Sequence, residues 1–507
     1  MTDTFKTYSR ENGGRVLLLF LLFLLALYQL THAGFSSFAI VCLIPVLVLA
    51  IYCEFKWKML AFWALIIINY FIQMKDISTR ITFPMSLPNE MLQIILLAIA
   101  IIDARINPHF EKCVNLMLFA LILWCGFCTI EVLNDTCNLG INISNWYSGA
   151  RLMAFQLLYI FLVFSIYIST PKNLIRYLII WGLFALFSAI WVWKQKTYGF
   201  TTVEQVWMET RGRRTHILNA GTLIRYFSTF SDAANYGCNA AATATAFIIF
   251  TITTKFNKLR IFYLIVSVLV IWGMFQSGTR TAIFCLAAGL LLFVVLSKSI
   301  KMAIPFSIAF VFFAFILVFT NIGQGNQQIR RMRSAFDKSD ASASVRDINK
   351  EAIKKYIQDA PWGIGIGMNQ ENVPANNKYR RLSMIPPDSE YVFIWVRTGP
   401  VGITIFVITT LIMLCGACWT VLFKLKNKTL IGIGGGLCGA FVAIHLGGYA
   451  NQVLMQYPNC LIFYGGLSIV YILPYLEPAW IEYENKQLAE RAERKRLKLE
   501  KKLASRV

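Results

Sequence analysis

Long apolar blocks recur along most of this chain and decide what it can fold into. A helix of about 20 residues, rising about 1.5 Å per residue, is long enough to cross the hydrocarbon core of a membrane. Alternating strands of about ten residues, which build membrane barrels, do not occur in the sequence. The blocks lie near residues 16–31, 36–53, 59–73, 88–102, 113–132, 150–168, 174–193, 233–254, 259–276, 281–297, 302–320, 391–423, 431–450 and 461–476. They predict an all-α, polytopic integral membrane protein with about 12–14 transmembrane helices.

The composition excludes several other classes of protein. The chain has 507 residues, of which 57% are hydrophobic and 15% are charged, whereas soluble globular proteins carry about 25% charged residues. A soluble enzyme, a secreted disulfide scaffold and a disordered protein are therefore excluded. The net charge is +22, but the basic residues lie mainly between the apolar blocks. We interpret this excess as a signal of membrane topology, not of nucleic-acid binding.

The basic residues are distributed unequally between alternate joints of the apolar blocks. With the N-terminus in the cytoplasm, the short outer joints hold only Lys75, Arg80, Arg151 and Arg280. The cytoplasmic joints are richer, and contain Lys56, Lys58, Arg105, Lys112, Lys172, Arg176, Lys255, Lys258, Arg260, Lys298, Lys301, Lys424, Lys426 and Lys428. The positive-inside rule then predicts that both termini are cytoplasmic. The first block is either a signal peptide, cut after Thr31-His32-Ala33, or a retained helix. We favour the retained helix, because the segment before it is long and contains acidic residues.

This topology divides the chain into six parts. The positive-inside rule applies to short loops, so it does not constrain the charge of the two long outer loops. Their composition can therefore indicate function. The parts are N-terminal transmembrane helices (1–193), an outer loop (194–232), central transmembrane helices with an outer Arg turn (233–320), a large outer loop with short amphipathic helices (321–390), C-terminal transmembrane helices (391–480) and a cytoplasmic basic tail (481–507).

A first cluster of polar residues, 225–237, leads from an outer loop into an apolar block. It begins with Arg225, and Ser231 or Asp232 is expected to cap the helix that follows. The free N–H groups at such a helix start can also bind an anion. The alternative is an ordinary cap with Asn235 buried and hydrogen-bonded.

Two further clusters lie in outer segments. The tight turn 276–281 puts Arg280 at the membrane surface, where the alternative is an arginine that reaches toward lipid headgroups. In the large loop, a sequence resembling a capping box at Ser344 predicts an amphipathic helix that stops before Pro361. The glycine run 363–367 follows and allows close backbone approach, although alone it is a weak signal for phosphate binding.

A fourth cluster lies where the large loop re-enters the membrane. Asp388 and Glu390 come just before an apolar block, and Arg397 lies two helical turns beyond Glu390. An arginine this far inside an apolar span must be paired or hydrated. The structural alternative is an ion pair between Glu390 and Arg397, with Asp388 as the helix N-cap.

In their order and shared outer location, these clusters resemble the O-antigen ligase and polymerase superfamily. The resemblance covers roughly residues 225–402, under half of the chain. It is carried by Phe230-Ser231-Asp232-Ala233-Ala234-Asn235, by Ser277-Gly278-Thr279-Arg280, by Arg346 with Pro361-Trp362-Gly363-Ile364-Gly365-Ile366-Gly367, and by Tyr391 followed by Gly399-Pro400-Val401-Gly402. Members of this superfamily share a helical fold in the bacterial inner membrane, with a large periplasmic loop, and transfer glycans from undecaprenyl diphosphate.

The resemblance implies a metal-independent glycosyltransferase without a cofactor, whose active site faces the periplasm. The donor would be a glycan on undecaprenyl diphosphate, and the acceptor a glycan or lipid A-core. Membrane lipids and a chain-length regulator are further candidate partners, and nucleic acid is not one. The residues to which it gives roles are Asp388, Glu390 and Arg280 in catalysis, Arg225, Arg280 and Arg346 in diphosphate binding, and Asn235, Tyr391 and Arg397 in support.

The sequence departs from the superfamily pattern at one position that helps to distinguish a polymerase from a ligase. Ligases typically carry a histidine at the loop exit, at the position that Asp388 occupies here. Polymerases vary more at this point, so Asp388 slightly favours a polymerase. The rival from another class is a lipid-linked oligosaccharide flippase. Flippases usually have short loops and two related halves, and both the long segment 321–390 and the absence of an internal sequence repeat argue against one.

Overall fold

The computed structural model describes most of the chain. The described residues are 13–32, 48, 52, 59–80, 86–103, 110–218, 223–297, 304, 308, 312, 315, 319–320, 325, 327–333, 341–385 and 389–504. Two compact units are present, Met1–Ala64 and Leu65–Val507. The predicted apolar blocks at 36–53 and 302–320 lie largely outside the described residues.

Helices make up nearly all of the regular structure. The one sheet of the described residues is the antiparallel pair β1–β2, in which Ile217 lies opposite Ile224. In chain order the elements are α2 (Gly13–His32), α4 (Leu60–Phe71), α5 (Lys75–Ser78), α6 (Ser86–Asp103), η1 (Phe110–Cys113), α7 (Leu116–Ile130), η2 (Glu131–Leu133), α8 (Ile143–Ala150), η3 (Arg151–Phe155), α9 (Gln156–Tyr167), α10 (Pro171–Thr197), α11 (Thr202–Trp207), η4 (Met208–Gly212), α12 (Arg213–His216), β1 (Ile217–Leu218), β2 (Leu223–Ile224), α13 (Ala233–Thr253), α14 (Asn257–Gln276), α15 (Thr281–Leu296), α17 (Gln327–Arg333), α18 (Ala341–Ile357), α19 (Arg380–Met384), α20 (Glu390–Trp419), η7 (Thr420–Lys424), α21 (Lys428–Ala450), η8 (Cys460–Tyr464) and α22 (Gly465–Ala504).

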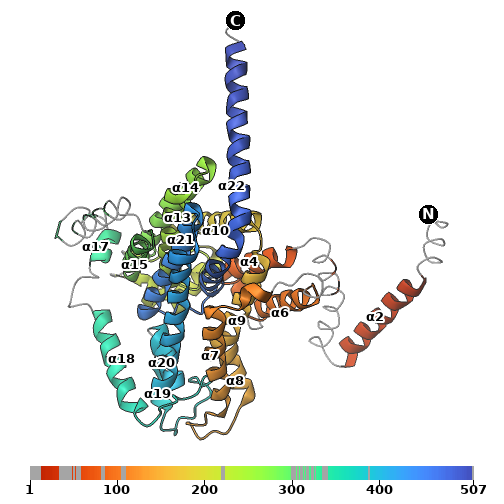
Figure 1. Cartoon of the computed structure of the whole chain (residues 1–507). Helices are drawn as coiled ribbons and strands as arrows, with labels where there is room; N and C mark the ends of the chain where they lie inside the picture. The colour runs from red at the N-terminus through yellow and green to blue at the C-terminus, as the bar shows by residue number, and fades with distance from the viewer. Residues whose placement is uncertain are drawn as a thin grey trace. The chain divides into compact units, whose positions relative to one another are not determined.

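The helices are those of a polytopic membrane protein (Figure 1). Every predicted apolar block that falls within the described residues coincides with a helix, which confirms the predicted all-α, polytopic fold. Leu60–Phe71 and Thr281–Leu296 are apolar but shorter than a full span. Within the described part of the chain, the 9 segments long and apolar enough to cross a membrane are Ser86–Asp103, Leu116–Leu133, Ile143–Tyr167, Pro171–Thr197, Ala233–Thr253, Asn257–Gln276, Glu390–Lys424, Lys428–Ala450 and Cys460–Glu493.

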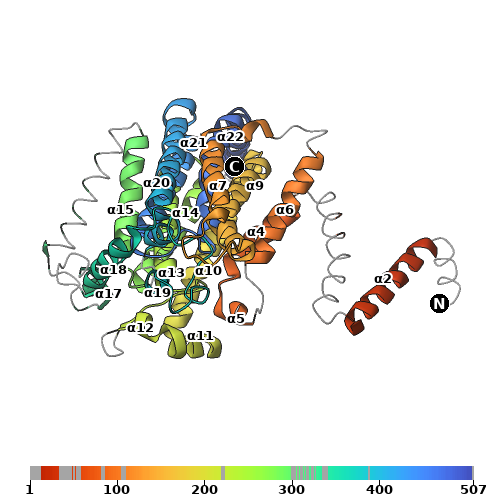
Figure 2. The ribbon, with the colours of Figure 1, turned by 90° about the horizontal axis from the view of Figure 1, so that it is seen from below.

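Small residues form the centre of the second unit. α13 is rich in alanine and α21 in glycine, and the two pack along each other, with α15 against both (Figure 2). A Cβ atom on Gly439 of α21 would lie 2.7 Å from the carbonyl oxygen of Gly289 in α15. In lipid, helices associate through close van der Waals packing and not through the hydrophobic effect, so small residues at the contact are favoured. The contact therefore depends on glycine at both positions.

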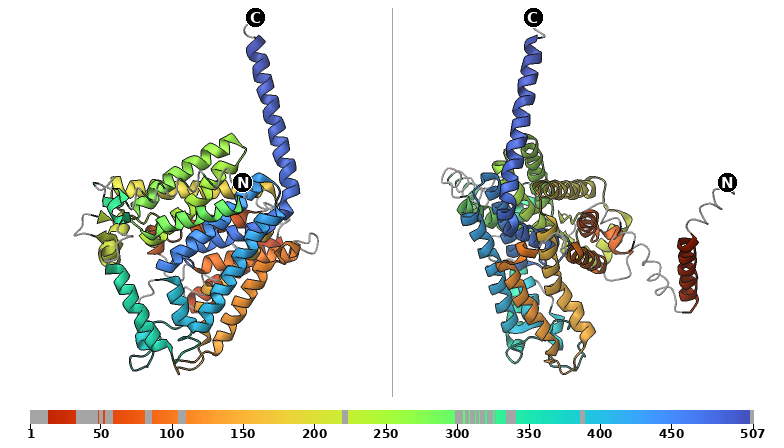
Figure 3. Two further views of the ribbon diagram at one scale, coloured as in Figure 1. Left: turned by 60° about the vertical axis from the view of Figure 1, so that its left-hand side comes forward. Right: turned by 45° about the vertical axis from the view of Figure 1, so that its right-hand side comes forward.

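The connections between helices contact one another in two groups. In one group, Glu484 of α22 accepts hydrogen bonds from Lys255 Nζ and Asn427 Nδ2, both at 2.9 Å. These residues belong to joints that the sequence assigns to the cytoplasm. In the other group, Asn134 Nδ2 donates to Trp362 O at 2.8 Å, joining two segments that the sequence assigns to the outside. In Figures 1 and 3 the C-terminal half of α22 points away from the end where α18 and α19 lie. Each contact thus joins connections that the sequence assigns to the same side of the membrane, as expected when successive spans cross in opposite directions.

The large loop, which the sequence assigns to the outside, carries α17, α18 and α19. α18 begins at Ala341, so the predicted start at Ser344 is wrong: Ser344 lies inside the helix and does not cap it. Its end at Ile357, before Pro361, agrees with the prediction. The loop has a small hydrophobic core, in which Ile353 and Ile364 pack with Cys137 from the connection between α7 and α8. This core fixes the loop on the end of the helix bundle.

Candidate functional site

Two of the predicted motifs meet at a break in α20. Pro400 has no N–H group, so it cannot donate to the carbonyl of Val396 as an ordinary helical residue would. The N–H of Ile364, in the glycine run, donates to Val396 O at 3.0 Å instead. The N–H of Gly365 donates to Arg397 O, also at 3.0 Å. The glycine run thus satisfies the carbonyl groups that the break in α20 exposes.

Glycine is required on both sides of this junction. Gly363 has φ +73° and Gly399 has φ +66°, a region that residues with a side chain rarely adopt. A Cβ atom on Gly363 would lie 2.4 Å from the backbone nitrogen of Gly399. The run is therefore built for backbone contact with α20. Since two of its N–H groups are occupied there, it is a poor phosphate cradle.

A cavity of about 430 Å³ lies beside this junction. Its walls come from the start of α20, the end of the glycine run, the connection after α21, the junction of α8 with η3, the segment before α5 and the start of α6. The lining residues are Gln73, Ser86, Ser148, Gly149, Leu152, Met153, Ile366, Gly367, Asn369, Glu390, Phe393, Arg397, Gln452, Met455, Gln456 and Tyr457. Two residues predicted for the site, Glu390 and Arg397, thus share one cavity.

Glu390 is held by backbone groups. Its side chain is buried, with 2% of its surface exposed, and its Oε2 accepts a hydrogen bond from the N–H of Leu454 at 3.0 Å. The neighbouring amides of Val453 and Met455 also interact with the carboxylate. Successive backbone N–H groups of this kind form a binding site for an anionic group. Glu390 therefore fastens the start of α20 to the connection after α21.

The alternative ion pair between Glu390 and Arg397 is wrong. Arg397 donates from Nη1 to the carbonyl oxygen of Ile366 at 2.9 Å, and its guanidinium lies 4.8 Å from the ring centre of Phe393. Within the described residues, no carboxylate forms an ion pair with Arg397. Arg397 is thus tied to the glycine run while it lines the cavity.

The loop exit just before α20 is capped by Ser389. Its Oγ accepts from the N–H of Val392 at 3.5 Å and donates to the carbonyl of Gly448 at 3.1 Å. The suggestion that Asp388 is the N-cap is therefore wrong. Asp388 itself lies outside the described residues. Tyr391 points toward α21, where its hydroxyl lies 3.1 Å from Nδ1 of His445.

A second candidate region surrounds the turn between α14 and α15. Arg225 donates from Nε to Ser277 O at 3.1 Å, and from Nη2 to Thr279 Oγ1 at 3.1 Å. Its Nη1 reaches Thr215 O at 2.8 Å. An arginine has five N–H donors, so about two remain after these three bonds. Burial lowers the pKa of Arg225, and the positive charge of Arg280 adds to this, against the effect of a nearby aspartate.

Two more arginines, Arg280 and Arg331, lie at the same turn. Arg280 is half-buried and immediately precedes α15. Arg331 of α17, which the sequence analysis did not single out, donates from Nε to Gly278 O at 2.7 Å. We call Arg225, Arg280 and Arg331 the arginine turn. Arg346 lies within α18, but its side chain is outside the described residues.

An amide chain links the start of α13 to the connection that holds Glu390. Asp232 caps α13, as predicted, by accepting from the N–H groups of Ala234 and Asn235. Asn459 then donates from its Nδ2 both to the Oδ1 of Asn235 and, at 2.9 Å, to the carbonyl of Val453. Val453 is the residue next to Leu454, whose N–H binds Glu390. Asn235 is buried and hydrogen-bonded. On the other side, Thr279 Oγ1, which accepts from Arg225, donates to the carbonyl of Ala233 at 2.8 Å. The start of α13 therefore connects the two candidate regions.

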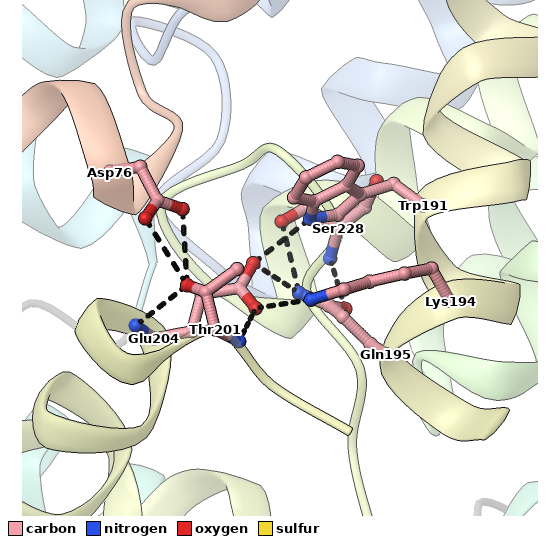
Figure 4. Close-up of polar contacts among 7 residues, drawn as sticks. All are labelled: Asp76, Trp191, Lys194, Gln195, Thr201, Glu204 and Ser228. Atoms are coloured by element: carbon pink, nitrogen blue, oxygen red, sulfur yellow. Dashed lines mark hydrogen bonds and ion pairs between the residues drawn. The ribbon is translucent and has the colours of Figure 1, made fainter. Parts of the chain in front are cut away.

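A buried carboxylate, Glu204, holds the loop 194–232 on the end of α10 (Figure 4). Its Oε1 accepts from Trp191 Nε1 at 2.9 Å and from Gln195 Nε2 at 2.8 Å. Gln195 in turn accepts from the N–H of Ser228 at 3.0 Å. Ser228 has φ +55° and begins the segment that leads to the cap of α13. Glu204 thus fixes the direction in which the chain approaches Asp232.

Two titratable side chains, Lys75 and His216, contact the segment that begins α13. Lys75 of α5, which lies beside α11, donates to Ser231 O at 2.6 Å and sits 3.8 Å from the ring centre of Trp207. Burial lowers the pKa of Lys75 to about 8. Nε2 of His216 accepts from the N–H of Ala233 at 3.0 Å, which requires this nitrogen to be unprotonated. Accordingly, burial lowers the pKa of His216 to about 4.

The sequence analysis missed the connection after α21. Residues 451–459 supply the amides around Glu390, the link through Asn459 and three polar lining residues, Gln452, Gln456 and Tyr457. This segment has no charged residue and matches none of the motifs. Its polar residues between two apolar blocks were the available signal, since polar residues beside a membrane span tend to line cavities.

One comparison with known proteins agrees with the motifs. Residues 265–407 match a family model described as O-Antigen ligase. The matched segment contains Arg280, the glycine run and the start of α20 through its break. A search of curated proteins found no match. The family match confirms the resemblance seen in the sequence and supports the assignment of this chain to the O-antigen ligase and polymerase superfamily.

Proposed function

We propose that this protein is a membrane glycosyltransferase of surface polysaccharide assembly, acting on O-antigen or on capsule or exopolysaccharide. It transfers a glycan from undecaprenyl diphosphate to a sugar hydroxyl, as a polymerase or a ligase. The observation that carries the proposal is a chain of hydrogen bonds between the arginine turn and the cavity of Glu390. It runs from Arg225 through Thr279 to the carbonyl of Ala233 at the start of α13, and from Asn235 through Asn459 to the carbonyl of Val453. This link supports a single site with a cationic end and a carboxylate end.

The chemistry of the reaction needs these two ends. The acceptor oxygen forms a bond to the anomeric carbon of the donor, while the bond from that carbon to the diphosphate oxygen breaks. Charge develops on the departing diphosphate, and Arg280 and Arg225 are suited to stabilise it, because the planar guanidinium binds two oxygens at once. The acceptor hydroxyl loses its proton to a carboxylate, for which Asp388 is our candidate. Undecaprenyl diphosphate leaves as the second product.

The active site is proposed to face the periplasm of the bacterial inner membrane. The basis is the distribution of Lys and Arg over the short joints. A cysteine introduced at Asn376, which is exposed in the large loop, should react with a membrane-impermeant maleimide in cells with a permeable outer membrane. A cysteine at Lys258, which is exposed in the first turn of α14, should react only after the inner membrane is permeabilised. The reverse labelling pattern would place the site on the cytoplasmic side of the membrane and contradict the proposal.

Transfer itself is tested with the purified protein in lipid vesicles. We expect that undecaprenyl-diphosphate-linked repeat units will be joined to an acceptor glycan, with release of undecaprenyl diphosphate, and that EDTA will leave the rate unchanged. Mass spectrometry of the glycan detects the new glycosidic bond. A flippase would move the donor across the vesicle membrane without forming this bond, and that outcome would exclude a transferase.

A further inference from the structure

The charges that line the cavity cancel. Among the described lining residues, Glu390 and Arg397 are the charged side chains, one negative and one positive. A diphosphate bound there would bring further negative charge beside the carboxylate of Glu390 and would find a single cation. The arginine turn, in contrast, has three guanidinium groups around one tight turn. Electrostatics therefore favour the diphosphate at the arginine turn and an uncharged molecule in the cavity.

Three glutamines supply hydrogen-bonding groups to the cavity. Gln73, Gln452 and Gln456 line it from two separate segments, and all three are half-buried. Within the described residues, their side chains make no hydrogen bond to the protein. Each amide offers two N–H donors and a carbonyl acceptor. Sugar hydroxyls both donate and accept, so this set of groups complements them.

The shape of the cavity also suits a sugar. Its volume of about 430 Å³ lies within the range of about 300–1,000 Å³ that is usual for small-molecule sites. The ring of Phe393 and the side chain of Met455 give it apolar surface, which can pack against the C–H face of a pyranose. Asn369 lines both this cavity and a more open polar hollow of about 660 Å³ in the large loop. A chain of sugars can therefore continue outward past Asn369.

We propose that this cavity is the acceptor subsite, and that it takes an uncharged sugar at the end of an acceptor glycan. The attacking hydroxyl lies at the Glu390 end, and the following sugars run past Asn369 into the hollow lined by Gln370 and Arg380. The inference rests on the proposed function, because it divides that site into a donor end at the arginine turn and an acceptor end at the three glutamines.

The test uses variants of two glutamines that have no partner in the described protein. Gln452→Ala and Gln456→Ala each remove one amide from the cavity, and neither is expected to disturb folding. Gln205→Ala is the matched control, because Gln205 is an exposed glutamine of the outer loop 194–232 that does not line the cavity. The probes are the oligosaccharide repeat unit released from the strain's own surface polysaccharide by mild acid, and a short-chain prenyl diphosphate.

Each cavity variant should weaken binding of the oligosaccharide to the whole protein in vesicles by roughly three- to tenfold, the usual value of one hydrogen bond. Binding of the prenyl diphosphate should not change, and Gln205→Ala should bind both probes as the wild type does. In transfer assays the variants should raise the KM for the acceptor and leave kcat unchanged. Weaker prenyl diphosphate binding with unchanged oligosaccharide binding would make the cavity a donor site and overturn the inference.

Unchanged binding of both probes by the variants would also overturn it. Binding of the oligosaccharide is measured without donor, so it reports on the cavity even if the protein transfers nothing. Oligosaccharide binding that depends on Gln452 and Gln456, together with no transfer when donor is added, would therefore uphold the sugar subsite and reject the proposed transferase function.

Discussion

Arg280→Ala is expected to lower the rate of glycan transfer by roughly tenfold or more while the protein is still produced at a normal level. A charge-assisted hydrogen bond is worth about 1.5–3 kcal/mol, and about 1.36 kcal/mol changes a rate tenfold. Arg280 is half-buried and, of the three arginines of the arginine turn, is the one that directly precedes α15. Arg280→Lys should also be poor, because a compact ammonium cannot bind two oxygens in parallel.

Arg214→Ala is the matched control for this experiment. Arg214 is an exposed arginine of α12 in the outer loop 194–232, so its loss changes the net charge equally. Transfer is measured in vesicles at saturating acceptor, with each variant normalised to the protein present. Wild-type turnover in Arg280→Ala would remove this residue from the site. An equal loss in Arg214→Ala would indicate a general effect of charge.

The transmembrane helices could be predicted because their signal is local. A run of apolar residues long enough to cross the membrane must become a helix, since lipid offers no partner for backbone N–H and C=O groups. The cap at Asp232 was predictable for a similar reason, because the N–H groups that donate to its side chain lie within three residues. Short-range physics therefore accounts for the fold class and for the start of α13.

The cavity could not be predicted in the same way. Asn235 and Asn459 are separated by 224 positions, and neither residue's neighbours indicate that they meet. The spacing of Glu390 and Arg397 suggested an ion pair, because both lie near the start of one helix. The prediction was misleading, since each side chain binds a backbone group of another segment instead. Backbone amides after α21 bind Glu390, and the carbonyl of Ile366 binds Arg397. The partner of Arg397 is available because α20 breaks at Gly399 and the glycine run packs against the break. The partner of Glu390 comes instead from the connection after α21.

The glycine run shows how a motif can be recognised and its purpose misread. Alternating glycines suggested close backbone approach, and this is what Gly363 makes with Gly399. The partner of that approach is the broken helix α20, and not a phosphate. Sequence alone specifies that something lies close to these glycines, whereas the identity of the neighbour depends on how the large loop folds back.

Asp388→Asn is expected to abolish transfer, with a loss of about 10²–10⁴-fold if this carboxylate takes the proton of the acceptor hydroxyl. The change is nearly isosteric, so expression and binding of the prenyl diphosphate should be unaffected. Asp388→His is expected to retain some activity, because ligases of the superfamily carry a histidine at this position. The length of the polysaccharide produced in a deletion strain, measured on gels, reports transfer for each variant.

Glu390→Gln provides the comparison that makes this result specific. The carboxylate of Glu390 is already engaged by the N–H of Leu454 and its neighbours, so it is poorly placed to accept a further proton during transfer. Its loss should instead loosen the connection after α21, since hydrogen bonds to a charged group are worth about 1.5–3 kcal/mol. We therefore expect Glu390→Gln to lower the yield of folded protein or its thermal stability. Full-length polysaccharide from Asp388→Asn, with Glu390→Gln inactive yet stable, would transfer the role of base from Asp388 to Glu390.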